Sequence, residues 1–202
     1  MAIVPLILFV VAGSGTPGPN NTIVMASGAS FGFRRTLPAI IGVNTGFPVM
    51  TILVGLGLGQ VIEQWPFILD VIRPIGVLYL LYLAWKIANG PTDVAARSAG
   101  KPPGFWQLAG FQFVNPKAWA MSVGAIAAFT GFWDSFLLEV LVIALAFLVF
   151  STPNTAIWTL IGVGAGRIIS KARHMRILNI VMAGLLVVSL IPAVIDTVES
   201  IS

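Results

Sequence analysis

Six long apolar runs divide the chain, and each is close to the length of a helix that crosses a lipid bilayer. Such a helix needs about 20 apolar residues, because each residue advances about 1.5 Å through a hydrocarbon core about 30 Å thick. Only 9% of the 202 residues are charged, against about 25% in soluble domains. The runs predict an all-α integral membrane protein with spans at Ala2–Ala26, Leu37–Ile62, Phe67–Ala88, Phe105–Thr130, Phe136–Gly164 and Ile177–Ile195.

Charged residues gather by sign in alternate connections and so predict the orientation of the spans. Cytoplasmic loops of membrane proteins are enriched in lysine and arginine. Nine of the eleven basic residues follow the first, third and fifth spans: Arg34, Arg35, Lys86, Arg97, Lys101, Arg167, Lys171, Arg173 and Arg176. The opposite connections and the chain ends hold one basic residue, Arg73, and six of the seven acids, Glu63, Asp70, Asp134, Glu139, Asp196 and Glu199.

This distribution explains the high isoelectric point through membrane orientation, so nucleic acid is not an expected partner. It predicts a multi-pass protein of the bacterial inner membrane with both termini in the periplasm. Glu139, near the outer end of the fifth span, is expected at the membrane interface.

The connection between the third and fourth spans divides the chain into two halves. Residues 89–104 contain Gly90-Pro91 and Pro102-Pro103 and little that is apolar, which is typical of a linker. A single transmembrane domain, residues 1–202, then consists of a first three-helix half, 1–88, a cytoplasmic linker, and a second half, 105–202. Three spans in each half invert one half relative to the other. The predicted fold class is six transmembrane helices as a 3+3 inverted repeat.

Proline and glycine interrupt the spans at matching places in the two halves. The first span contains Thr16-Pro17-Gly18-Pro19, and the fourth contains Asn115-Pro116 at the corresponding depth from the other face. The second and fifth spans contain a further matched pair, Gly42 to Pro48 and Ser151 to Asn154. Proline alone kinks helices without any function. Irregular backbone inside a membrane must be buried in protein or line a watery cavity, so the breaks are expected to face each other near the midplane.

Thr16, Asn115 and Thr152 each stand directly before a proline. An N-cap residue followed by proline is a common helix start, so each is expected to begin a half-helix. A helix start presents unpaired N–H groups and partial positive charge, which attract an anion such as a carboxylate. We therefore predict a binding site for a small amino acid at Pro17, Gly18, Pro19, Asn20, Asn21, Asn44, Asn115, Pro116, Lys117 and Asn154.

Lys117 is the one basic residue placed inside a span. A lysine at the centre of a membrane helix costs about 2.5–3.5 kcal/mol on insertion scales, so it is expected to face a cavity or a partner. Two roles are open: it binds the substrate carboxylate or changes protonation during transport, or it donates to carbonyls that the breaks set free. No Asp or Glu lies in the middle of a span. A cationic substrate side chain would therefore lack a carboxylate, and the pattern favours neutral amino acids.

The chain lacks the sequence signatures of several classes of protein. There is no cysteine, which excludes disulfides and thiol catalysis. No phosphate-binding loop, metal-binding cluster or nucleophile with a neighbouring base is present, so neither a cofactor nor an enzymatic activity is expected. The chain contains four spaced glycine pairs: Gly28/Gly32, Gly42/Gly46, Gly55/Gly59 and Gly162/Gly166. Such pairs let helices approach closely, either within one molecule or across a homodimer, and the sequence does not decide between these two possibilities.

The chain resembles the LysE/RhtB family of amino-acid exporters in three segments. They are Pro17-Gly18-Pro19 with the spaced glycines that follow it, Gly76–Lys86, and Asn115-Pro116-Lys117. The segments Ala84–Ala88, Phe111–Asn115 and Leu178–Val181 are most similar to its cysteine/O-acetylserine efflux branch. Phe47 stands where many members carry Asp or His, a departure that agrees with a neutral substrate.

The sequence and the resemblance together predict a secondary-active exporter of small neutral amino acids or derivatives, such as cysteine, O-acetylserine, threonine or homoserine. The substrate and the lipid bilayer are the expected partners. The alternatives are an exporter of basic amino acids such as lysine, a channel-like pore, and a scaffold subunit that transports nothing.

Overall fold

A computed structural model describes residues 3–58, 64–65, 67–92, 100–169, 171–188 and 191, without the side chains of 58, 67–73 and 76. All regular structure in these residues is helical. Several predictions fall outside the described backbone or side chains: the orientation of both termini, the middle of the linker, and the charges of Glu63, Asp70, Arg73, Arg97, Asp196 and Glu199.

The predicted first span consists of two helices, α1 (Ile3–Gly15) and α2 (Pro19–Phe31), which are bent by 53° relative to each other. Pro17 and Pro19 lack the N–H groups that would continue the helix through this point. α2 extends past the predicted end at Ala26, and Gly32, at φ 79°, turns the chain directly into the next helix. That positive φ costs little only for glycine.

The second and third predicted spans are α3 (Phe33–Leu53), continued by the π-helical turn η1 (Val54–Leu58), and α5 (Phe67–Ala88). α3 runs through Pro48 without interruption, so the predicted break in the second span is wrong. Polar side chains one turn earlier add hydrogen bonds to nearby carbonyls: Asn44 Nδ2 donates to Ile40 O (3.0 Å) and Thr45 Oγ1 to Ile41 O (2.8 Å). Membrane helices tolerate proline when polar side chains satisfy the backbone in this way.

The second half begins with α7 (Phe105–Phe111), the 3₁₀ turn η2 (Gln112–Val114) and α8 (Pro116–Phe129). The chain leaves the helical conformation at Asn115, which confirms the break in the fourth span. α9 (Phe136–Ile168) and α10 (Ala172–Val188) follow. α9 continues through Pro153 while the Thr152 hydroxyl donates to Leu148 O. The predicted break and helix start at Thr152 are therefore wrong.

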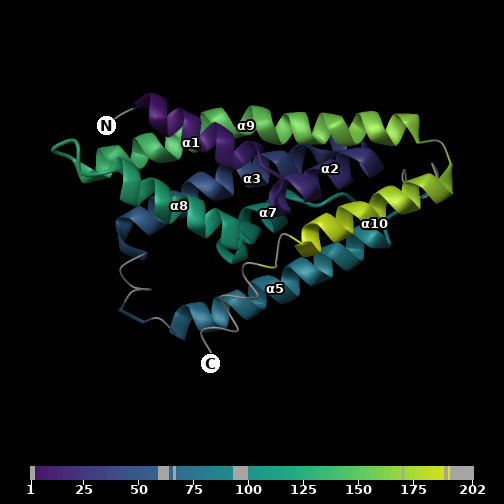
Figure 1. The fold of residues 1–202 in the computed structure, drawn as a ribbon, viewed down its shortest axis with the longest axis horizontal. Helices are drawn as coiled ribbons and strands as arrows, with labels where there is room; N and C mark the ends of the chain where they lie inside the picture. The colour runs from purple at the N-terminus through teal and green to yellow at the C-terminus, as the bar shows by residue number, and fades with distance from the viewer. Residues whose placement is uncertain are drawn as a thin grey trace.

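The helices of one half pack against those of the other in reciprocal pairs. α2 and α1 lie along α9, α7 lies along α3, α3 contacts α9, and α5 lies beside α10. In Figure 1, α9 runs along one edge of the molecule and the α5–α10 pair along the other, with the broken helices between them. Each predicted half therefore contributes a broken helix that packs on the long, unbroken helix of the other half.

Glycines allow the closest of these approaches. A Cβ on Gly162 would overlap the main-chain oxygen of Met25 where α9 crosses α2, and one on Gly42 would overlap Phe105 O where α3 crosses α7. Gly46 and Gly166 lie one turn further along the same crossings, against Ala109 O and Ala29 O. These glycine pairs therefore serve contacts within one molecule, as small residues do in membrane helix packing.

The outer surface of the helices is apolar. α9 exposes a stripe of large aliphatic side chains that includes Leu137, Leu141, Leu145, Leu148, Ile157 and Leu160. Among the described residues, Phe33–Gly57 and Phe136–Ile168 are long and apolar enough to cross a membrane, and the bent α1–α2 pair makes a third if it counts as one span. The molecule is a helical membrane protein; the six-span arrangement stays a prediction.

Glu139, for which an interfacial position stays a prediction, has its side chain fully buried within the protein. Its carboxylate accepts hydrogen bonds from the backbone N–H groups of Gly131 (2.7 Å), Phe132 (2.8 Å) and Trp133 (2.9 Å). A carboxylate can be buried at low cost when several donors face it. Glu139 therefore fixes the turn between α8 and α9.

Candidate substrate site between the broken helices

The C-terminal end of α1 is held by side chains from three other parts of the chain. The last carbonyls of a helix lack partners within it, and at depth in a membrane each needs another donor. The donors here are Thr16 Oγ1 to Gly13 O (2.8 Å), Asn21 Nδ2 to Ser14 O (2.7 Å) and Thr16 O (2.9 Å), Trp158 Nε1 to Gly15 O (3.3 Å), and Asn154 Nδ2 to Val11 O (3.2 Å).

Lys117 joins the two breaks. Its ammonium donates to Thr16 O (3.0 Å), Thr16 Oγ1 (2.7 Å) and Pro17 O (3.3 Å). These contacts confirm that the breaks of the first and fourth spans face each other. Of the two roles left open by the sequence, donation to the freed carbonyls is present in this structure, whereas binding of a substrate carboxylate stays a prediction.

The two half-helices that start at the breaks differ in their caps. α8 starts as predicted, with Pro116 in its first turn and Asn115 Oδ1 accepting from Lys117 N (3.2 Å). α2 starts at Gly18 rather than at Thr16, and no side chain caps it. The prediction for Thr16 is wrong because the second proline, Pro19, moves the start of the helix by two residues. The start of α2 therefore lacks a side-chain cap, and its residues Gly18, Asn20 and Asn21 line the cavity beside it.

A cavity of about 30 Å³ lies where the breaks meet. Its lining includes five of the predicted site residues, Gly18, Asn20, Asn21, Asn115 and Lys117. The other lining residues come from α1, α3, α8 and α9: Gly13, Ser14, Val43, Phe47, Ala118, Met121, Ser151 and Thr155. About 30 Å³ holds one or two water molecules. An amino acid can bind here only if the helices around the cavity move apart.

The other predicted residues lie around this cavity without lining it. Pro17, Pro19 and Pro116 form the breaks themselves. Asn44 Oδ1 accepts hydrogen bonds from the two α9 hydroxyls of the lining, Ser151 (3.2 Å) and Thr155 (3.3 Å). Asn154 Nδ2 donates to the hydroxyl of Ser14 (2.7 Å), which also lines the cavity. These residues position the wall, and direct contact with a substrate is not available to them in this conformation.

Gln112 belongs to the site and was not predicted from the sequence. Its fully buried amide forms a reciprocal pair with Asn20: Asn20 Nδ2 donates to Gln112 Oε1 (2.9 Å), and Gln112 Nε2 donates to Asn20 Oδ1 (3.0 Å). The sequence feature that could have identified it is a glutamine within an apolar run, three residues before the break at Asn115. The pair joins α2 to η2 and adds a further polar link between the halves.

Replacing Gln112 by leucine is expected to lower the stability of the folded protein. The change leaves the half-buried Asn20 amide without its partner, a loss that costs about 1–3 kcal/mol when a buried polar group stays unsatisfied. Thermal unfolding in detergent measures the effect, with Gln64→Leu, at an exposed position outside the site, as the control. Equal unfolding midpoints for the two variants would contradict a stabilising role of the Asn20–Gln112 pair.

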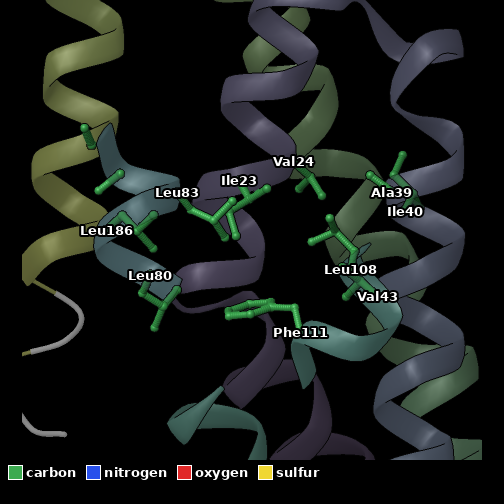
Figure 2. Packing of buried hydrophobic residues seen from close by; sticks show 12 residues of the cluster. Ile23, Val24, Ala39, Ile40, Val43, Leu80, Leu83, Leu108, Phe111 and Leu186 are labelled. Atoms are coloured by element: carbon green, nitrogen blue, oxygen red, sulfur yellow. The ribbon is translucent and has the colours of Figure 1, made fainter. Parts of the chain in front are cut away.

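Two hydrophobic clusters enclose this polar layer. One joins α2, α3, α5, α7 and α10; Figure 2 shows Phe111 extending from α7 toward Leu80 of α5, with Ile23 and Leu83 above it. The other joins α1, α3, α8 and α9 and includes Leu6, Phe47, Ala118 and Phe147. Val43 of the first cluster and Phe47 of the second both line the cavity. The cavity is therefore closed by apolar side chains in two directions.

Comparison with known proteins gives a consistent result. Residues 11–191 match the sequence profile of the family described as LysE type translocator. A cysteine/O-acetylserine efflux protein of Salmonella typhimurium (strain LT2) is 35% identical over 176 residues, which cover 85% of this chain and 87% of the relative. A protein of the same description from Escherichia coli (strain K12) is 32% identical over 173 residues, with the same coverage. No solved structure matches the chain.

Proposed function

Because the chain belongs to the LysE family of translocators, we propose that it exports small neutral amino acids or their derivatives from the cytoplasm, as a secondary transporter. The relatives named for cysteine and O-acetylserine efflux support this class of substrate. The chain is a transport protein of the membrane and not an enzyme. In the proposed topology the basic connections face the cytoplasm and both termini face the periplasm.

One observation carries the proposal: the cavity between the two breaks combines a cation, an uncapped helix start and no carboxylate. Lys117 and the start of α2 at Gly18 both lie in its lining, and the described part of the chain contributes neither Asp nor Glu to it. An ammonium and the N-terminal N–H groups of a helix both attract a carboxylate. Hydroxyl and amide oxygens of Ser14, Asn21 and Ser151 are available to accept from the substrate ammonium. A cationic side chain would find no opposite charge there.

Substrate binding would change the contacts of Lys117. The three hydrogen bonds that its ammonium donates go to the break of the first half, while Lys117 itself belongs to the second half. A carboxylate that takes one of these donors removes a link between the halves. Binding of the substrate is thereby coupled to widening of the cavity, so substrate binding favours movement of the halves relative to each other.

The reciprocal packing of the helices supports a 3+3 inverted repeat. Exchange of the halves maps the α1–α9 contact onto the α7–α3 contact and returns the α3–α9 and α5–α10 contacts to themselves. In inverted-repeat transporters the site lies at the repeat interface near the midplane, between broken helices. The two hydrophobic clusters would then serve as gates toward opposite sides of the membrane, opened in turn.

Counterflow in proteoliposomes tests this function. Vesicles loaded with unlabelled O-acetylserine should take up labelled cysteine transiently above equilibrium, with a saturable rate that unlabelled threonine or homoserine reduces. Flux that neither saturates nor shows counterflow would indicate a pore, and its complete absence would indicate a scaffold subunit. Counterflow with lysine alone would overturn the proposal of a neutral substrate.

A further inference from the structure

A second and larger cavity lies along α2, within about three helical turns of the central one. It has a volume of about 250 Å³ and is bounded by α2, α5, α7, α10 and the ends of the linker. Its polar lining consists of Ser27, Ser30, Lys86, Asn89, Lys101, Gln107 and Asn179. About 250 Å³ equals the volume of roughly eight water molecules, which is enough for a small amino acid. We name this cavity the vestibule.

Two tethers hold the linker ends at the vestibule. The buried side chain of Asn179, on α10, donates to Gly90 O (3.3 Å). Arg35, at the start of α3, donates to Gly100 O. Gly90 and Gly100 both line the cavity. The vestibule is therefore formed by packed helices and by loop ends that are hydrogen-bonded in place.

The charge of the vestibule suits an anionic group. Among the described residues, its lining includes Lys86 and Lys101 and neither Asp nor Glu. Both lysines follow the third span, on the side where the basic connections lie, so the proposed topology places the vestibule at the cytoplasmic face. A concave site with charge of one sign raises the local concentration of the oppositely charged ligand.

A thin apolar layer separates the vestibule from the central cavity. Ile23 lines the vestibule, and Asn20, one turn earlier on α2, lines the central cavity. Ile23 packs in the first hydrophobic cluster with Phe111 and Leu108, and Gln112, the residue after Phe111, pairs with Asn20. Movement of these side chains would join the two cavities into one path along α2.

We propose that the vestibule is a separate binding site, which takes the carboxylate of the amino acid at Lys86 and Lys101 before transfer to Lys117. The inference rests on the proposed export function. It adds a cytoplasmic site to the central one, so that the purified protein binds substrate in two places. A substitution at Lys117 removes binding at the central site and leaves the vestibule able to bind.

Alkylation of a single cysteine tests the vestibule directly, because the natural chain contains none. Ser30→Cys places a thiol in the vestibule wall, and Ser135→Cys, at the start of α9, is the reference outside both cavities. O-acetylserine should slow the reaction of Ser30→Cys with N-ethylmaleimide and leave Ser135→Cys unaffected. The protection should persist when Lys117→Met is added, which separates this site from the central one.

The lysines are tested by charge removal in the Ser30→Cys background. Lys86→Gln with Lys101→Gln should raise the half-protecting concentration of O-acetylserine by about fivefold, since each exposed ion pair contributes modestly. Lys86→Arg with Lys101→Arg should keep it. Two results would overturn the proposal. One is an unchanged half-protecting concentration of O-acetylserine in the glutamine variant. The other is protection of the Ser30→Cys thiol by phosphatidylglycerol vesicles to an extent that added O-acetylserine does not alter. Absence of protection at concentrations that saturate counterflow would refute the vestibule alone, whereas absence of counterflow would refute the function.

Discussion

Lys117→Met is expected to reduce saturable transport by about 100-fold or more while the protein still folds. Methionine keeps the length and the apolar stem but removes the charge, so a substrate carboxylate loses its cation inside a water-poor site. Hydrogen bonds to charged groups contribute about 1.5–3 kcal/mol each, and more than one such contact is expected with a carboxylate. The measurement is counterflow in proteoliposomes, resolved into the half-saturating concentration and the maximal rate.

The structural role of Lys117 predicts a separate and smaller effect. Loss of its ammonium leaves Pro17 O without its donor, whereas Thr16 O keeps the amide of Asn21. One unsatisfied carbonyl costs about 1–3 kcal/mol, so the unfolding midpoint should fall without loss of the fold. Lys171→Met, at an exposed position outside the site, is the matched control and should change neither property. If the Lys117→Met protein folds and keeps its half-saturating concentration and maximal rate, Lys117 serves only to satisfy the carbonyls at the break and does not bind the substrate.

Gly162→Ala is expected to destabilise the protein strongly, although alanine favours helix over glycine by about 1 kcal/mol. The added methyl group would overlap the main-chain oxygen of Met25, and backbone cannot move aside as a flexible side chain can. Overpacking of this kind costs about 1–3 kcal/mol, and more where the contact is with backbone. The α2–α9 crossing would open and disturb the break that α2 begins.

Gly164→Ala is the matched control for this prediction. Gly164 lies on the same helix two residues away, and a Cβ there meets no atom within 4 Å. The control should be neutral or slightly stabilising, so the two alanine variants should shift the unfolding midpoint in detergent in opposite directions. Equal shifts would show that the α2–α9 contact is looser than the structure has it.

The breaks in the first and fourth spans were predictable because local chemistry decides them. A continuous helix is disfavoured in the first span by the consecutive residues Pro17, Gly18 and Pro19. In the fourth span, Asn115 provides a cap and Pro116 a compatible first turn for a new helix. The second and fifth spans contain one central proline each, Pro48 and Pro153. There the backbone loses one hydrogen bond, neighbouring polar side chains satisfy carbonyls nearby, and packing keeps the helix straight enough to continue.

Partners across the helices were not predictable, because they depend on tertiary contacts. The sequence gives no indication that Gln112 pairs with Asn20 or that Trp158 Nε1 donates to Gly15 O. Asn44 and Asn154 were assigned to the substrate from their residue type and position, and the structure directs both to hydroxyls and carbonyls of the wall. Within the described chain, every buried polar side-chain atom has a partner. Polar residues in the spans therefore first satisfy the broken backbone.

The central claim is that a substrate carboxylate binds at Lys117 and the start of α2. The most direct test compares equilibrium binding of cysteine and of cysteinamide, which lacks the negative charge, to the wild-type protein and to Lys117→Met. The wild type should prefer the acid by about 10- to 100-fold, as expected for one or two charge-assisted hydrogen bonds, and Lys117→Met should lose most of this preference. Equal binding of acid and amide by the wild type, or an undiminished preference in Lys117→Met, would contradict the account.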